Sequence, residues 1–224
     1  MDLQSISDNN ILRPSLKTRG VLIGANMKIY DISQELFSCV VWPGDPAPQK
    51  ETLCSMDKGD IINLTAFSMC AHNGTHIDAP SHFINHAKNV DQIDLSKFIG
   101  EAFVVDFDGV VSNVDALNII KKAESASSES AKRILLKGKT TVSLEAAKVF
   151  ADAGIYLIGN ESQTVGPEDR PMAVHKVLLG AEVVLLEGVR LADVPEGVYL
   201  LNAAPIKLAG AEGSPCRAVL IRMS

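Results

Sequence analysis

Short apolar runs that alternate with helical patterns fill the second half of the sequence, and they constrain the fold more than any other feature. The runs that read as buried strands are residues 102–107, 134–136, 155–158 and 183–186. The stretches with helical spacing or helix-end signals are residues 114–123, 143–153 and 172–181. Strands that alternate with helices predict an α/β domain. Two further strands, at residues 198–208 and 216–222, follow each other without a helix, so we expect a mixed sheet with some antiparallel pairs.

The first third of the chain is less regular. Residues 29–33 alternate apolar and polar as a half-buried strand does, and residues 42–46 carry two prolines and a glycine that indicate a turn. Residues 61–70 are again strand-like. Residues 1–26 show no period and are predicted to be an N-terminal leader or arm. The remaining residues, 27–224, are predicted to form one domain, since no linker or internal repeat divides them.

Composition and charge narrow the classes of protein. Of 224 residues, 46% are hydrophobic and 21% charged, values that suit a folded globular chain and exclude a disordered one. The formal net charge of −6 offers no electrostatic footprint for a phosphate backbone, so nucleic acid is not an expected partner. No apolar run reaches the roughly 20 residues that span a membrane, and the N-terminus lacks a secretory signal. We therefore expect a cytoplasmic protein with no membrane partner.

Histidines gather in one short segment. The chain has five, and four of them, His72, His76, His82 and His86, fall within fifteen residues (86 − 72 + 1). A helix of the zinc-protease type is excluded, because Asn73 replaces the glutamate that such a helix carries and a glycine follows it. A lone histidine is usually a surface or core residue. Three histidines and an aspartate around Gly-Thr and Pro indicate a metal or catalytic site instead, and His86 is expected at the surface or just outside that site.

Three of the candidate ligands share a sequence parity. In an extended chain, residues two apart face the same side, so His72, His76 and Asp78 project together if their segment is extended. Pro80 then ends the strand, and His82 lies on the turn beyond it. Imidazole and carboxylate donors without thiolate suit zinc, manganese, iron or cobalt. The four cysteines lie far apart without a Cys-x-x-Cys pair, so neither a disulfide framework nor a cysteine zinc site is expected.

The histidine segment also matches a known signature. Residues 72–83, His-Asn-Gly-Thr-His-Ile-Asp-Ala-Pro-Ser-His-Phe, resemble the motif of the metal-dependent cyclase-family hydrolases, which include bacterial kynurenine formamidase and isatin hydrolase. Residues 31–33 with 42–45 resemble the family's opening, and residues 210–219 its ending. The resemblance runs from about residue 29 to 221. It implies a single swivelling β/β/α domain with a mixed sheet, and association as a homodimer or homotetramer.

The resemblance implies a role for each residue of the motif. His72, His76 and Asp78 match the motif's metal ligands, and His82 matches the histidine that transfers protons. Trp42, the only tryptophan, lies where the formamidase branch has a tryptophan that contacts the aromatic substrate. From the residues alone, packing on the neighbouring proline turn explains Trp42 equally well.

His175 and Glu187 complete the implied ligand set. The family adds a distal histidine and a glutamate twelve residues later, and these two residues have that spacing (187 − 175 = 12). Glu187 also ends an apolar strand, where a cation would offset the cost of burying a carboxylate. Five protein ligands exceed the four of a single tetrahedral zinc, which favours two zinc ions. One zinc ion, or one manganese ion as the isatin-hydrolase branch suggests, is the alternative.

The implied activity is hydrolysis of a carbon–nitrogen amide bond by a metal-activated water. The named expectation is an arylformamidase that converts N-formyl-L-kynurenine into kynurenine and formate. The alternatives are hydrolysis of a small aromatic lactam or lactone, as in isatin hydrolase, ring closure in polyketide synthesis, and, in another class, a metal-bound ligand-binding protein without turnover. The presence of His82 as a proton-transfer residue argues against that last alternative.

The sequence departs from the family pattern in two places. Asn160 and Glu161 stand where formamidase-like members carry an aspartate, and Lys176 follows His175 where the histidine is often doubled. Neither change removes an implied ligand. Both are expected to alter the surroundings of the site and the choice of substrate.

Overall fold

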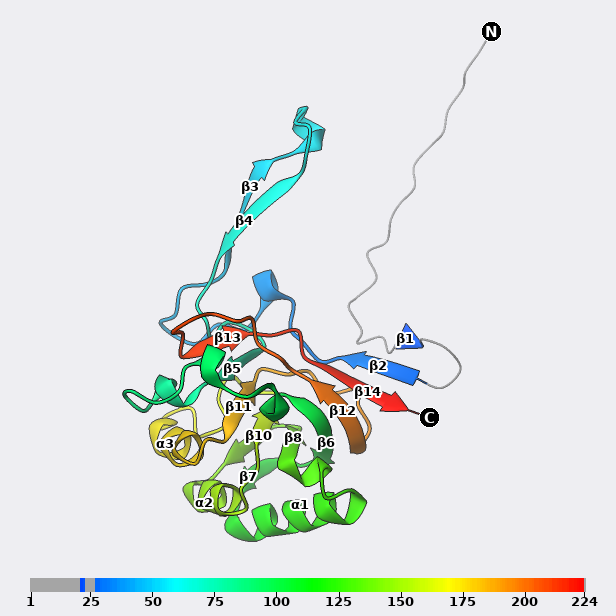
Figure 1. Ribbon diagram of the computed structural model, residues 1–224, viewed down its shortest axis with the longest axis vertical. Coiled ribbons are helices and arrows are strands. Elements are labelled where there is room, and N and C mark those ends of the chain that lie inside the picture. Colours follow the sequence, from blue (N-terminus) through cyan, green and yellow to red (C-terminus); the bar gives the residue numbers. More distant parts are fainter. Residues whose placement is uncertain (1–20, 23–26, 224) are drawn as a thin grey trace.

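The computed structural model describes residues 21–22 and 27–223. Within them, one mixed sheet of ten strands forms the body of the protein, and three α-helices lie together on one side of it (Figure 1). The strands of this sheet are, in spatial order, β1 (Val21–Leu22), β2 (Met27–Asp31), β14 (Val219–Met223), β12 (Gly197–Asn202), β6 (Ile99–Asp106), β8 (Arg133–Lys137), β10 (Leu157–Asn160), β11 (Val184–Glu187), β5 (His76–Asp78) and β13 (Gly213–Pro215). The helices are α1 (Asn113–Ala126), α2 (Leu144–Asp152) and α3 (Met172–Gly180).

The centre of the sheet is parallel and its flanks are antiparallel. Strands β6, β8, β10 and β11 are parallel neighbours in chain order, and α1, α2 and α3 form the connections between them. Successive crossovers of one hand that step across a sheet in one direction place all their helices on the same face. Strands β12 and β14 on one flank, and β5 and β13 on the other, pair antiparallel. The α/β class and the mixed sheet predicted from the sequence are confirmed.

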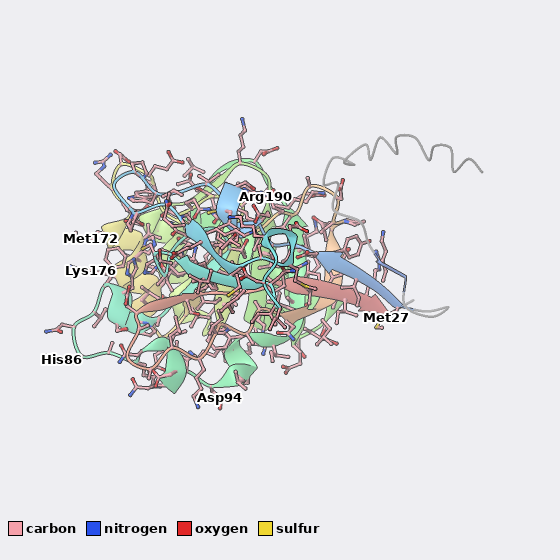
Figure 2. All side chains as sticks on the ribbon, turned by 90° about the horizontal axis from the view of Figure 1, so that it is seen from above. Met27, His86, Asp94, Met172, Lys176 and Arg190 are labelled. Atoms are coloured by element: carbon pink, nitrogen blue, oxygen red, sulfur yellow. The ribbon has the colours of Figure 1, made fainter. Side chains whose placement is uncertain are left out.

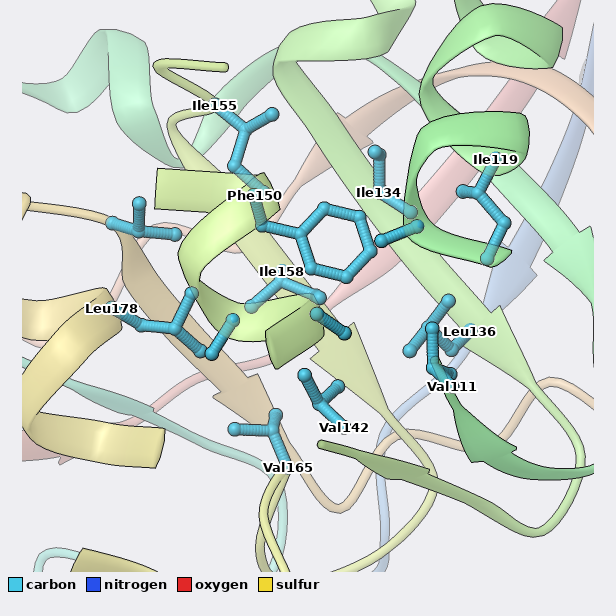
Figure 3. Packing of buried hydrophobic residues seen from close by; sticks show 14 of the residues in the cluster. Val111, Ile119, Ile134, Leu136, Val142, Phe150, Ile155, Ile158, Val165 and Leu178 are labelled. Carbon is cyan, nitrogen blue, oxygen red and sulfur yellow. The ribbon is translucent and has the colours of Figure 1, made fainter. Parts of the chain in front are cut away.

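The hydrophobic core occupies both faces of the central strands. In β8, Ile134 and Leu136 face the helices, and Leu135 faces the other side, where the sheet curls over a second cluster. Phe150 of α2 is fully buried between Ile134, Ile158 and Ile119 (Figure 3). Burial of both faces explains why these strands read in the sequence as continuous apolar runs, without alternation.

The ends of the helices follow local signals. The Ser143 hydroxyl accepts a hydrogen bond from the backbone N–H of Ala146, 3.1 Å away, and so caps α2 as predicted. Gly154, just beyond the end of α2, has φ +63°, a conformation that glycine adopts without strain. Three strand predictions were too long. The expected strand at 61–70 is confined to Leu64–Ser68, that at 198–208 ends at Asn202, and that at 216–222 begins at Val219.

A separate hairpin, β3 (Gln49–Cys54) and β4 (Leu64–Ser68), projects from the body on the side away from the helices (Figure 1). The sequence predicted β4 but not β3. Both strands are almost entirely exposed, but β4 reads Leu-Thr-Ala-Phe-Ser, with alternating apolar residues, whereas β3 begins with the polar residues Gln-Lys-Glu. The short parallel pair β7 (Gly109–Val111) and β9 (Thr140–Val142) was also not predicted. Large apolar side chains exposed on the hairpin are those of Leu53, Met56, Ile61, Ile62, Leu64 and Phe67.

Most of the predicted N-terminal arm, residues 1–20 and 23–26, lies outside the described residues. Val21 and Leu22 pair antiparallel with Ile29 and Lys28 at the edge of the sheet. Among the described residues, no helix is long and apolar enough to cross a membrane.

Candidate metal centre and active site

Two neighbouring strands bring together the central residues of the site. In the antiparallel pair β5–β11, His76 lies opposite Glu187 and Asp78 lies opposite Leu185. Leu185 belongs to the helix-side core, and residues two apart on a strand share a face, so His76, Asp78 and Glu187 all point to the helix side. The nitrogen His76 Nε2 lies 3.3 Å from Asp78 Oδ1 and 3.5 Å from Glu187 Oε2.

Helix α3 places His175 over this strand pair. Its Nε2 lies 3.2 Å from Glu187 Oε1 and 3.6 Å from Asp78 Oδ2. On the other side of the ring, Nδ1 lies 2.9 Å from the carbonyl oxygen of Pro171, just before the helix, which fixes the orientation of the imidazole. The twelve-residue spacing of His175 and Glu187 thus corresponds to a direct contact between them.

His72 joins the cluster from a turn, and not from the extended strand that was predicted. Only residues 76–78 are extended, and residues 71–75 form a turn, with Gly74 at φ +68°. The parity argument is therefore wrong for His72, although it holds for His76 and Asp78. The turn carries His72 Nδ1 to 2.8 Å from Asp78 Oδ1. In the turn, the side-chain oxygen of Asn73 accepts a hydrogen bond from the N–H of Cys70 at 2.8 Å.

The electrostatics of the cluster are dominated by its two buried carboxylates. Asp78 and Glu187 are 1% and 2% exposed. Burial disfavours the charge of Asp78, yet hydrogen bonds with His72 and His76 hold its pKa well below the usual range. Burial likewise opposes protonation of His76, but hydrogen bonds with Asp78 and Glu187 raise its pKa to about 10. The cluster therefore attracts positive charge, in the form of protons or of a metal ion.

His82 lies at the rim of the cluster, in a short 3-10 turn that begins at Pro80. Its ring stacks on that of His72, with centroids 4.1 Å apart, and its Nε2 lies 3.9 Å from Asp78 Oδ2. Its side chain is 28% exposed, more than the other histidines of the cluster. Burial nevertheless lowers the pKa of His82, so its imidazole is neutral near pH 7 and able to accept a proton.

Among the described residues, the donor atoms form three groups. One joins His72 to His82 and Glu212 at the rim, and the other two share Asp78. His72, His76 and Asp78 have ligand atoms within 4.8 Å of one another, and so do Asp78, His175 and Glu187. Imidazole nitrogens and carboxylate oxygens in this number suit a divalent metal ion of the zinc or manganese type. Two buried carboxylates side by side need cations to balance them, and the donor set therefore fits a divalent metal centre.

The sequence of this chain matches known proteins over most of its length. The Cyclase family model, described as "Putative cyclase", matches residues 30–167. The chain belongs to the Cyclase family. Kynurenine formamidase of Erythrobacter litoralis is 34% identical over 207 residues, which cover 86% of this chain and 93% of that protein. Kynurenine formamidase of Bacillus anthracis is 35% identical, covering 86% of this chain and 97% of that protein.

Solved structures agree with the family assignment. A potential metal-dependent hydrolase with cyclase activity superposes with a TM-score of 0.73 at 26% identity, covering 88% of this chain and 99% of that chain. Isatin hydrolase A from Labrenzia aggregata superposes with a TM-score of 0.72 at 22% identity, covering 88% of this chain and 94% of that chain. The latter likeness concerns the fold alone.

Asn160 and Glu161, which differ from the family pattern expected from the sequence, both form hydrogen bonds to nearby backbone groups. The buried Asn160 amide group donates to the carbonyl oxygens of Thr164 at 3.0 Å and Thr140 at 3.4 Å. The Glu161 carboxylate accepts from the backbone N–H groups of Gly138 and Leu191, each 2.9 Å away. These residues therefore hold loops next to the site.

Two residues that the sequence analysis placed near the site, His86 and Lys176, lie on the outside of the molecule. His86 is exposed on an outlying loop, and Lys176 is exposed on α3 beside His175 (Figure 2). The surface alternative considered for His86 is the one observed. Lys176, although adjacent to a ring of the cluster in sequence, points away from it because neighbouring residues of a helix face different sides.

Trp42 is half-buried on the segment that leads into the hairpin. Its carbonyl oxygen accepts from the N–H of Asp45 at 3.0 Å, which closes the predicted proline turn. Asp45 Oδ2 in turn lies 3.7 Å from the sulfur of Cys70, two residues before His72. The turn that carries Trp42 is thus joined to the turn that carries His72.

Sequence reasoning gave no role to Glu212 or Gly213, which lie beside His72. Glu212 Oε1 is 3.3 Å from His72 Nε2. A Cβ atom on Gly213 would lie 2.5 Å from Cε1 of His72, so the glycine provides the space for the ring. Both belong to the segment that resembles the family's ending, and no local pattern there marks either residue as a neighbour of His72.

Gly188 offers a test of how tightly the loops around the site are packed. Its φ is +69°, and a Cβ there would lie 2.5 Å from both Gln34 Nε2 and the carbonyl oxygen of Gly74. We expect Gly188→Ala to lower the free energy of unfolding by about 3 kcal/mol, through backbone strain and crowding together. Gly154→Ala is the control, because Gly154 has φ +63° and nothing within 4 Å of a Cβ.

Thermal unfolding of both glycine variants measures the difference. The control carries only the conformational cost of roughly 1 kcal/mol, so its melting temperature should fall by about 3 °C and that of Gly188→Ala by about 9 °C. Equal shifts for the two variants would mean that crowding at Gly188 contributes nothing.

Proposed function

We propose that this chain is a metal-dependent hydrolase of a carbon–nitrogen amide bond, and specifically an arylformamidase that converts N-formyl-L-kynurenine and water into kynurenine and formate. The observation that carries the proposal is the convergence of three histidines and two buried carboxylates, with His82 beside them, in a chain 34–35% identical to kynurenine formamidases.

The residues proposed to hold the metal are His72, His76, Asp78, His175 and Glu187. We propose zinc as the ion, since its ligands are imidazole nitrogens and carboxylate oxygens. Two ions are supported by the two donor groups that share Asp78, and one manganese ion is the alternative. A divalent metal bound there would supply a Lewis acid for the amide carbonyl and a water of lowered pKa.

The proposed role of His82 is proton transfer. Its neutral imidazole stands at the rim of the cluster, exposed enough to meet a substrate, and Nε2 faces Asp78. It would accept a proton from the attacking water and deliver that proton to the nitrogen that leaves. Stacking on His72 and an edge contact with Phe83, at a centroid distance of 4.4 Å, hold the ring in place.

Trp42 is proposed to contact the aromatic ring of the substrate. The connection of its turn to the segment before His72, through Asp45 and Cys70, supports this role, because it places the tryptophan on a loop joined to the metal-binding turn. A loss confined to substrate affinity in Trp42→Ala would agree with this role.

The decisive experiment measures hydrolysis of N-formyl-L-kynurenine after chelation and after restoring zinc or manganese. Turnover that disappears with the metal and returns with one ion would support the formamidase and identify that ion. An absence of turnover with either ion, in protein that binds the metal, would reject this substrate. Isatin and simple aromatic lactones would then be assayed. Binding of an aromatic acid without any product would favour a ligand-binding protein.

We also propose that the chain assembles as a homodimer or homotetramer, with the β3–β4 hairpin in the interface. A two-stranded hairpin is at best marginally stable alone, and this one exposes a group of large apolar side chains, including Ile61 at 93% and Ile62 at 54%. Patches of this kind mark interaction surfaces. Its charged residues have both signs, Lys50 and Lys58 with Glu51, Asp57 and Asp60, which suits pairing with a second copy.

The hairpin proposal predicts that a charge at its tip prevents association. We expect Ile61→Asp to shift the mass measured by light scattering from that of an oligomer to that of a monomer. Val110→Asp is the matched control, because Val110 is 65% exposed on β7, outside the hairpin. A wild-type protein that is monomeric, or an Ile61→Asp variant that stays oligomeric, would contradict the proposal.

A further inference from the structure

The three histidines of the cluster each turn one ring nitrogen inward to the carboxylates and the other outward. For His76 and His175, the inward atom is Nε2, and the outward Nδ1 faces a backbone carbonyl oxygen, that of Gly74 at 3.0 Å and that of Pro171 at 2.9 Å. His72 has the opposite orientation. Its inward atom is Nδ1, 2.8 Å from Asp78, and its outward Nε2 faces Glu212 at 3.3 Å.

The backbone around Glu212 holds its side chain beside His72. The Glu212 carbonyl oxygen accepts from the N–H of Ala79 at 2.8 Å, and the next residue, Gly213, pairs with Asp78 in the β13–β5 ladder. Because Gly213 has no side chain, the His72 ring lies close against this strand. The carboxylate itself is 47% exposed, so it stands at the opening of the cluster.

We propose that Glu212 is a positioning residue of the metal centre, whose carboxylate accepts a hydrogen bond from Nε2–H of His72 and thereby leaves Nδ1 as the nitrogen that binds the metal. The inference rests on the metal site of the proposed function and extends it to a residue outside the ligand set. Histidine ligands commonly donate their second N–H to a carboxylate or carbonyl group, which fixes the tautomer and makes the ring a stronger ligand.

The geometry sets His72 apart from the other two histidines. A carboxylate acceptor forms a stronger, charge-assisted hydrogen bond than a backbone carbonyl does. His72 also lies on a turn, without the support of a strand or helix that His76 and His175 have. The ligand with the least backbone support is therefore the one that has a charged partner.

The test combines zinc affinity with the protonation of the histidine rings. Zinc affinity is measured by competition with a chromophoric chelator for the wild type, Glu212→Gln and Glu212→Ala. Long-range ¹H–¹⁵N spectra of the zinc-loaded proteins report which ring nitrogen of each histidine carries a proton. Glu124→Gln is the control, since Glu124 is exposed on α1 and its change removes the same charge.

In the wild type, we expect His72 to be zinc-bound through Nδ1 and protonated at Nε2, and His76 and His175 to show the reverse. Glu212→Ala should weaken zinc binding by about 10-fold to 100-fold. Glu212→Gln, whose amide oxygen still accepts the hydrogen bond, should recover much of that loss. The Glu124→Gln control should bind zinc as the wild type does.

Three results would overturn the inference. His72 bound to zinc through Nε2 would show the wrong nitrogen to be assigned. Unchanged zinc affinity in Glu212→Ala would remove the positioning role. Loss of a whole zinc equivalent in Glu212→Ala and Glu212→Gln alike would make Glu212 a ligand. The wild-type measurement separates this inference from the proposed function, because a wild type that binds no zinc or manganese would reject the metal site itself.

Discussion

Replacing Asp78 by asparagine should abolish metal binding and lower turnover by at least about 10³-fold, the equivalent of about 4 kcal/mol in the activation barrier. Asparagine keeps the size of the side chain but removes its negative charge. The Asp78 carboxylate contacts His72, His76 and His175 and is the residue shared by the two donor groups that the five proposed ligands form, so its charge serves the whole cluster.

The Asp78→Asn experiment measures bound zinc by elemental analysis after dialysis, together with hydrolysis of N-formyl-L-kynurenine. Asp152→Asn makes the same chemical change at an exposed position at the end of α2 and should retain both metal and activity. If Asp78→Asn holds a full complement of metal and turns over normally, Asp78 is not a ligand and the proposed centre is wrong.

The second large effect is expected for His82→Ala, which should keep its metal and lose about 10²-fold to 10⁴-fold in turnover, the range of general acid–base catalysis. The reason is the position of His82. It lies at the rim, 3.9 Å from Asp78, and is not one of the five proposed ligands; its donor atom groups with those of His72 and Glu212. Removal of the imidazole therefore deletes proton transfer without removing a proposed ligand.

His86 provides a matched control for His82. It lies four residues further along, is exposed, and has φ +63°. Asparagine tolerates that backbone conformation, so His86→Asn removes an imidazole without strain and should leave turnover unchanged. Normal turnover in His82→Ala would exclude His82 from the mechanism. A parallel loss of metal would place His82 among the ligands instead.

Local patterns in the sequence account for much of the fold. The apolar runs at 134–136 and 183–186 become β8 and β11, and Ser143 begins α2 by the hydrogen bond that its residue type predicts. These elements were predictable because an apolar run and a capping residue can both be recognised within a short stretch of sequence. Strand β3 was not, because it begins with the polar residues Gln-Lys-Glu and shows no apolar alternation.

The residues of the candidate site were also selected by the sequence, since four histidines in one short segment and the His175–Glu187 spacing stand out. Their arrangement was decided by the tertiary structure. His72 enters on a turn instead of a strand, and Asp78, as the shared residue, meets His175 only because α3 packs over β5 and β11.

The contact between Glu212 and His72 could not be predicted from the sequence. Glu212 is 140 residues from His72 along the chain, and nothing local marks it as a partner of that ring. The pairing of β13 with β5 brings the two side chains together. The sequence by itself therefore indicated most of the side chains of the candidate site. The pairing of strands distant in the chain brought those side chains together, because hydrogen-bonded ladders set the contacts between residues far apart in sequence. The outward nitrogens of His76 and His175 are instead held by carbonyl oxygens two and four residues away.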